Sequence, residues 1–191
     1  LDDRPFQQDV AKAKALLAQA GVPDGFEIAL DHTSGPPHAD IAQAIQANLA
    51  SVGIKVTLVA AEARQVITKT RARQHQMAIV RWGADYFDPH TNAEAFSMND
   101  DNSENARNRT IAWRSSWLIP ELTQRVRANV LQADSEKRTA EYLELQRIHQ
   151  QTSPFVIMLQ EIEVAVARAG VTGLDLGPMS DRTSWAGTAK A

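Results

Sequence analysis

One segment of the chain reads Met77-Ala-Ile-Val-Arg-Trp-Gly-Ala-Asp-Tyr-Phe-Asp-Pro-His90. Its first part, residues 77–82, predicts a strand because four apolar residues stand in a row without a turn former. Gly83 ends this strand, and two carboxylates, Asp85 and Asp88, follow among aromatic residues. An apolar run that ends abruptly in polar residues is typical of a buried parallel strand. Because ligands of open α/β sheets bind outside the carboxyl ends of the strands, we expect a site here.

Helices and strands are predicted to alternate before this segment. Helical periodicity lies at residues 9–21, 40–53 and 62–74, and strand patterns lie at 26–31 and 54–58. Asp9 and Asp40 are the expected N-caps of the first two helices, each of which ends at a glycine. This series predicts a three-stranded, largely parallel sheet with right-handed crossovers.

The second half of the chain is less regular. Residues 91–115 are expected to be irregular, with a long polar loop at residues 99–109. Two helices and then two strands are expected after it, at residues 118–131, 135–150, 155–159 and 163–168. The tail from Gly170 onward is rich in Gly, Ser and Thr, so we expect it to need a partner surface to become ordered.

Composition excludes several classes of function. The 191 residues allow one substantial core or two small ones, and 43% apolar and 23% charged residues are usual for a soluble globular protein. A net charge of -3 without a basic tract gives no argument for nucleic-acid binding. The absence of cysteine excludes disulfides, thiolate catalysis and cysteine-based zinc sites. No signal peptide opens the chain, which is consistent with a processed or truncated piece of a longer protein.

Asp85 and Asp88 allow more than one interpretation. They form an acid/base pair if the protein is a glycoside hydrolase, whereas the Asp-Pro dipeptide favours Asp88 as the cap of a following helix. A single carboxylate beside an aromatic ring suits a different task, the binding of an ammonium group. Trp82 then offers its indole face to the cation, unless it is a core tryptophan.

Motifs for metal or nucleophilic catalysis are missing. The five histidines, at positions 32, 38, 75, 90 and 149, include no pair with the i, i+4 spacing of a zinc helix. No Gly-x-Ser-x-Gly sequence marks a serine nucleophile. The sequence therefore predicts no metal site, no cofactor and no catalytic residue.

Several motifs follow one another along the chain. They are Asp9-x-x-Lys12-Ala-Lys14-Ala-Leu-Leu-Ala-Gln-Ala-Gly21-x-Pro-Asp-Gly-Phe26, Ile41-Ala-Gln-Ala-Ile-Gln-Ala-Asn-Leu49, Gly53-Ile-Lys-Val56, Trp82-Gly-Ala-Asp85-Tyr-x-Asp-Pro89, Asp134-x-x-x-Arg138, Leu145-Gln and Ser153-Pro-Phe-Val. In this order they resemble the carboxyl-terminal part of the family 5 extracellular solute-binding proteins. These are the peptide-, dipeptide- and nickel-binding receptors of ABC importers. The resemblance runs from about residue 9 to at least 178.

The resemblance implies an α/β fold, a lobe like that of a type II periplasmic binding protein, with a mostly parallel sheet flanked by helices. Residues 1–163 are expected to form the carboxyl-terminal ligand-binding lobe, incomplete at its start. Residues 164–191 are expected to cross back to a missing amino-terminal lobe. The lobe is thus expected to be one part of a two-lobed receptor.

The resemblance also implies a function without chemical turnover. The receptor captures peptides or a related small solute in a cleft between its lobes, and it delivers them to an ABC permease in the inner membrane. It is expected in the periplasm, or exported and tethered to a membrane. Two alternatives stay open: a receptor of the same family for a nickel chelate, sugar or opine, and a hydrolase that uses Asp85 and Asp88.

Four residues carry the expected ligand contacts. The resemblance assigns Asp85 to the terminal ammonium of a peptide and Trp82 to the lining of side-chain pockets, and Tyr86 is expected to shape the wall. Arg81 stands where many members have glycine. A cation there is expected either to alter the pocket or to claim Asp85 for itself.

Overall fold

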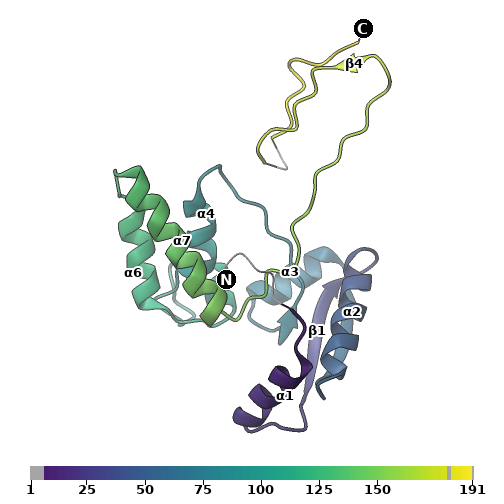
Figure 1. The fold of residues 1–191 in the computed structure, drawn as a ribbon, viewed down its shortest axis with the longest axis vertical. Coiled ribbons are helices and arrows are strands. Elements are labelled where there is room, and N and C mark those ends of the chain that lie inside the picture. The colour runs from purple at the N-terminus through teal and green to yellow at the C-terminus, as the bar shows by residue number, and fades with distance from the viewer. Residues whose placement is uncertain (1–6, 180–181, 191) are drawn as a thin grey trace. The chain divides into compact units, whose positions relative to one another are not determined.

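The computed structural model describes residues 7–179 and 182–190. The chain divides into two compact units, which we call the amino-terminal unit, up to Arg81, and the carboxyl-terminal unit, from Trp82 onward. Figure 1 shows the elements of each unit along the chain. Each unit has a hydrophobic cluster of its own.

A parallel sheet is the centre of the amino-terminal unit. Its elements are α1 (Val10–Gln19), β1 (Glu27–Thr33), α2 (His38–Ala50), β2 (Lys55–Ala61), α3 (Ala63–Arg71) and β3 (Met77–Ala78). The strand order is β2-β1-β3, and both neighbours of β1 run parallel to it. The predicted three-stranded parallel sheet is therefore confirmed.

The core of this unit lies between the sheet and α2. Leu30, in the middle strand, is paired with Leu58 on β2 and with Met77 on β3. Buried Val56 and Ala42 pack in the same cluster. Burial of each large aliphatic side chain contributes about 1.5–3 kcal/mol, so this cluster is what holds α2 on the sheet.

Two glycines allow the chain to pass close to itself beside this sheet. Gly25 and Gly53 both have positive φ, and a Cβ on Gly25 would clash with the carbonyl group of Gly53. The same Gly53 follows α2, as predicted from the sequence. The turn before β1 and the turn before β2 therefore meet at a point that excludes side chains.

The third strand is shorter than predicted. It covers Met77–Ala78 instead of residues 77–82. The Ile79 N–H still donates to the Asp31 carbonyl at 2.9 Å, but Val80 and Arg81 are exposed. β3 lies at the edge of the sheet and, among the described strands, pairs only with β1, and the burial that would sustain it stops at Ile79.

The second helix begins earlier than predicted. Pro37 occupies the N-cap position of α2, and Asp40 lies in the first turn instead of capping the helix. An aspartate in that turn still interacts favourably with the positive end of the helix dipole.

Helices build the carboxyl-terminal unit. Its elements are α4 (Pro89–Ser97), α5 (Ile111–Arg114), α6 (Pro120–Asn129), α7 (Ser135–Thr152), β4 (Val171–Thr172) and β5 (Ala189–Lys190). α4 packs against α6 and α7 around buried Met98, Val126 and Leu145. The polar loop predicted at residues 99–109 is confirmed, and α4 and α5 lie on either side of it within the stretch that was expected to be less regular. No helix in the described ranges, α7 included, is long and apolar enough to cross a lipid bilayer.

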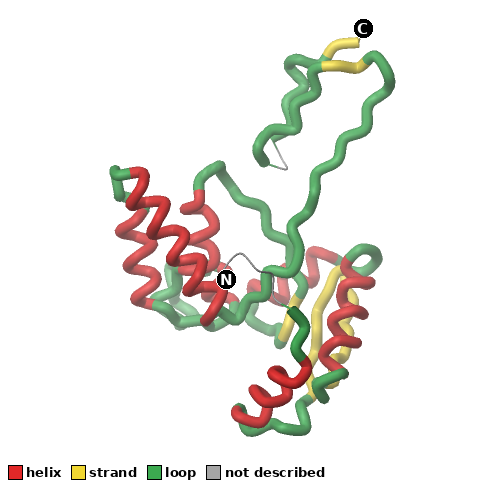
Figure 2. The backbone as a smooth tube through the Cα atoms, in the orientation of Figure 1, coloured by secondary structure: helices red, strands yellow, loops and turns green. Residues whose placement is uncertain are grey.

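The strands predicted at 155–159 and 163–168 are absent. Figure 2 shows this stretch as loop from the end of α7 to β4. Its apolar side chains are exposed, Val156 by 77% and Val166 by 94%. A strand needs a neighbour for its backbone hydrogen bonds, and no other described strand pairs with this segment. Farther on, β4 and β5 form a short antiparallel pair.

Candidate functional site

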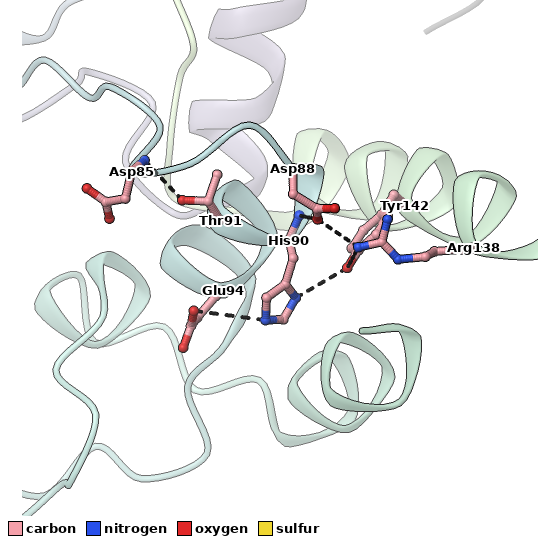
Figure 3. A network of polar contacts seen from close by, with 7 residues as sticks. All are labelled: Asp85, Asp88, His90, Thr91, Glu94, Arg138 and Tyr142. Carbon is pink, nitrogen blue, oxygen red and sulfur yellow. Dashed lines mark hydrogen bonds and ion pairs between the residues drawn. The ribbon is translucent and has the colours of Figure 1, made fainter. Parts of the chain in front are cut away.

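Asp88 begins helix α4 and ties it to helix α7 (Figure 3). Its Oδ1 accepts a hydrogen bond from the backbone N–H of His90 at 2.8 Å and another from Arg138 Nη2 at 2.7 Å. The Arg138 hydrogen bond, with a smaller contribution from the His90 N–H, lowers the pKa of the Asp88 carboxyl. The predicted role of Asp88 as a helix cap is confirmed, and its carboxylate stays ionised.

The polar network continues from Arg138 across both helices. The guanidinium lies over the ring of Tyr142, 4.9 Å from its centroid. The Tyr142 hydroxyl lies 3.2 Å from His90 Nδ1, and His90 Nε2 lies 3.9 Å from a carboxylate oxygen of Glu94. Burial raises the pKa of Tyr142, so its hydroxyl stays protonated and able to donate. The network fixes the start of α4 against the middle of α7.

Asp85 is held by its backbone, which leaves its side chain available. Its N–H donates to the hydroxyl oxygen of buried Thr91, in the first turn of α4, at 3.2 Å. Figure 3 shows the carboxylate pointing away from that hydroxyl. Within the described part of the carboxyl-terminal unit, the carboxylate makes no hydrogen bond or ion pair. Asp85 is thus an exposed anion on a fixed backbone.

Trp82 is partly exposed, by 37%, and is not a core tryptophan. Its indole Nε1 donates to Asn92 Oδ1 at 2.9 Å. Phe96 meets the indole edge to face, with ring centroids 5.5 Å apart. Because Asn92 and Phe96 both belong to α4, this helix holds the indole at one end of the 82–88 loop, as it holds Asp88 at the other.

An aromatic cluster that the sequence did not predict supports Trp82. Phe96 also meets Phe155 and His149, and His149 stacks on Phe155 at 5.6 Å with an interplanar angle of 7°. Trp117 packs edge to face on the same two rings. Burial lowers the pKa of His149, and its Nε2 has no hydrogen-bond partner among the described atoms. No sequence spacing links these rings, because they come from four separate places in the chain.

The other two expected ligand residues, Tyr86 and Arg81, lie in different units of the chain. Tyr86 is exposed by 42%, and its carbonyl accepts from the Asp88 N–H at 2.9 Å. Local burial, with smaller effects of Glu94 and Asp88, raises the pKa of its hydroxyl. Arg81 is exposed and belongs to the amino-terminal unit. Its predicted influence on Asp85 stays a prediction.

Metal coordination finds no support in this geometry. Among residues 7–179 and 182–190, no group of three or more histidine, aspartate or glutamate side chains is placed to hold a metal ion. What the 82–88 loop offers is one available carboxylate, an indole face and a phenol ring. These groups suit a cation that is attached to an apolar or polar body.

Comparison with known proteins relates the chain to a group of binding proteins. Residues 1–104 match the family model described as bacterial extracellular solute-binding proteins, family 5 Middle. Over 183 residues the chain is 31% identical to Di/tripeptide-binding protein 2 of Pseudomonas aeruginosa, a match that covers 94% of this chain and 33% of that protein. The chain therefore spans about a third of the length of the curated relatives that it matches.

Solved structures that are similar to this chain are also binding proteins. The chain is similar to the ABC transporter-associated periplasmic binding protein DppA of Helicobacter pylori in complex with the peptide STSA, at 28% identity and a TM-score of 0.62. That match covers 78% of this chain and 28% of the other. A second similar structure is AgaA of A. tumefaciens R10 in complex with agropinic acid, at 25% identity, a TM-score of 0.62, and 75% and 28% coverage.

Proposed function

Because the chain belongs to the bacterial extracellular solute-binding proteins of family 5, we propose that it forms ligand-binding structure in a receptor that captures small peptides for an ABC importer. The membership confirms the family that the sequence motifs resemble. The likeness to periplasmic binding proteins confirms the predicted fold, a partial α/β lobe of the type II class. The relatives are binding proteins of transport systems, which supports binding without turnover.

One observation carries the proposed chemistry: the available carboxylate of Asp85, whose backbone Thr91 holds. A peptide brings an ammonium group with three donors, and the pairing strengthens when a closed cleft excludes water. The partly exposed indole of Trp82 adds cation–π attraction or packs on a ligand side chain. Tyr86 contributes to the wall, and Arg81 tunes the charge near the pocket.

Small peptides fit this chemistry better than the other solutes that the family takes. The similar proteins include di/tripeptide-binding proteins and a structure in complex with the peptide STSA. An opine receptor is the alternative, because the agropinic acid complex is a structural match of the same TM-score. A ligand without a free ammonium would leave Asp85 without a partner in the closed cleft.

The domain organisation that we propose has two parts. Residues 1–163 belong to the carboxyl-terminal ligand-binding lobe, and residues 164–191 cross to an amino-terminal lobe of the same receptor. The exposed apolar side chains between Val156 and Val166 support the crossing, since such a run is stable in water only when another surface covers it. The receptor works outside the inner membrane, in the periplasm or tethered to a membrane, and delivers its ligand to a permease.

The hydrolase interpretation is disfavoured by Asp88. A mechanism with two carboxylates needs one of them as a proton donor with a raised pKa. The hydrogen bond from Arg138 lowers the pKa of Asp88, so Asp88 is not that donor. Its Oδ1 is also already bound by Arg138 and by the His90 N–H of the α4 cap, so it is not placed to attack a substrate.

Native mass spectrometry tests the ligand class. The protein expressed from its native gene and purified from its own compartment is expected to carry a mixture of bound masses that fragment as peptides of a few residues. Release under mild denaturation and sequencing identify them. Recovery of one sugar, opine or metal chelate in place of peptides would contradict the proposal and favour the other class of receptor.

A further inference from the structure

We propose that Arg138 is a positioning residue for Asp85, acting through Asp88 and the first turn of α4. The inference rests on the proposed function, in which Asp85 binds the ligand ammonium. Arg138 lies on α7, 53 residues after Asp85, and its guanidinium contacts Asp88 instead of Asp85. Its effect on a ligand is therefore indirect.

The 82–88 loop depends on such contacts for its shape. It contains no helix or strand, so its conformation is set where it is fastened. At its carboxyl end, Asp88 Oδ1 accepts from both His90 N–H and Arg138 Nη2. The Asp88 N–H also donates to the Tyr86 carbonyl. A charge-assisted hydrogen bond of 2.7 Å is the strongest kind in this set.

Thr91 transmits the position of Asp88 to Asp85. Its backbone N–H donates to the Asp88 carbonyl at 3.2 Å, and its hydroxyl oxygen accepts from the Asp85 N–H. A shift of Asp88 thus moves the residue that holds the ammonium-binding carboxylate. Binding groups have to stay within about 0.5 Å of their productive geometry to keep their effect.

Arg138 is itself fixed well enough to act as an anchor. Its side chain is mostly buried and lies over the ring of Tyr142, which is only 3% exposed and belongs to the core of the unit. The Asp88 carboxylate raises the pKa of Arg138 further, so the guanidinium is charged at every accessible pH. The anchor is therefore a partly buried side chain that lies against the core through Tyr142.

The same contact separates the roles of two neighbouring aspartates. Asp85 and Asp88 are three residues apart, so a ligand ammonium could bind either carboxylate if both were unpaired. Arg138 neutralises Asp88 and leaves Asp85 as the available anion. The arrangement therefore directs the cation to one position on the loop.

A comparison of free and acetylated peptides tests the inference. Calorimetry on the protein expressed from its native gene measures the Kd of di-, tri- and tetra-alanine and of their N-acetylated forms, which lack the ammonium. The ratio of the Kd of the acetylated peptide to the Kd of the free peptide reports on recognition of the ammonium, to which Asp85 contributes the charge pair. Arg138→Gln is expected to reduce this ratio about tenfold, or about 1.4 kcal/mol, by weakening only the free peptides, because neighbours that share contacts are coupled.

Three further variants separate positioning from damage to the fold. Asp88→Asn keeps the capping oxygen but loses the ion pair, so it is expected to reduce the ratio as Arg138→Gln does, and the double variant to reduce it no further. Arg138→Lys restores part of the ratio. Arg147→Gln, which removes an exposed ion pair with Glu144 on the same helix, leaves the ratio unchanged.

The outcomes distinguish two failures. If the wild-type protein binds free and acetylated peptides equally, or binds none of them, the proposed function fails and the inference with it. If the wild type discriminates and Arg138→Gln either keeps the full ratio or weakens both peptide forms alike, the proposed function stands and the positioning role is overturned.

Discussion

Asp85 and Asp88 show how contacts, and not residue type, assign roles at this site. Asp88 is bound by a helix N-terminus and an arginine, whereas the Asp85 carboxylate is left to face outward. The role of Asp88 as a helix cap was predictable because the signal, an Asp-Pro dipeptide, consists of adjacent residues in the sequence. The link to Arg138 was not, since a contact 50 residues away in sequence leaves no local pattern. The same holds for the rings of Phe96, His149 and Phe155 behind Trp82.

His149 gives a pH-dependent stability that can be measured. Burial lowers its pKa in the folded protein below the usual value of 6.5. The unfolded chain therefore binds more protons than the folded one below about pH 6.5, and acidification favours unfolding. The stability is complete above that pH and is lost as the pH falls toward the lowered pKa of the folded state.

The corresponding variant is His149→Phe, which keeps an aromatic ring on Phe155. We expect the loss of unfolding free energy between pH 7.5 and 5.5, measured by urea titration, to be smaller in this variant than in the wild type. His75, whose pKa burial also lowers, accounts for part of what remains. An equal loss in both proteins would show that His149 is not protonated preferentially in the unfolded state. His38→Gln serves as the control.

At the scale of elements, the sequence predicted those features that local chemistry determines. Alternating apolar residues and glycine stops predicted β1, β2 and their parallel pairing correctly. The errors are elements that depend on distant partners. β3 stops where burial ends, and the apolar segment after α7 has a strand-like sequence but pairs with none of the described strands. The helix that Asp88 was expected to cap is α4, but its end was not predicted, because its polar residues obscure the helical period.

An ion pair between Asp31 on β1 and Lys69 on α3 joins these two elements, and its contribution to stability can be measured. Asp31 is 2% exposed, and its Oδ1 accepts from Lys69 Nζ at 2.7 Å while Oδ2 has no partner among the described atoms. Lys69→Met would leave the buried Asp31 carboxylate without its ion-pair partner, which costs about 3–5 kcal/mol of unfolding free energy. Lys55→Met, which removes a fully exposed pair with Glu27, is expected to cost less than about 1 kcal/mol.

Urea titration of Lys69→Met and Lys55→Met measures the loss of unfolding free energy in each variant. Equal, small losses would show that water reaches Asp31 and that the pair is not what secures α3 to the sheet. A larger loss in Lys69→Met that disappears in the double variant Asp31→Asn/Lys69→Met would confirm that the cost comes from the unpaired carboxylate.

At the scale of the whole molecule, we propose that the chain is ligand-binding structure within a larger receptor. It spans about a third of its curated relatives, and its apolar segment after α7 is exposed. The order of the sequence motifs predicts this organisation, which no single element carries. The proposed pairing of Asp85 with a ligand ammonium depends on the loop that α4 and Arg138 hold in place.

Calorimetry of peptide binding by the wild type and by Asp85→Asn measures how much the Asp85 carboxylate contributes to peptide affinity. Removal of one partner of a desolvated charge pair costs about 2 kcal/mol or more, so the variant is expected to bind tri-alanine about 30-fold more weakly. Asp101→Asn, an exposed aspartate in the same unit, is the matched control and should bind as the wild type does. Equal affinity of the wild type and Asp85→Asn for tri-alanine would show that Asp85 does not bind the ligand ammonium.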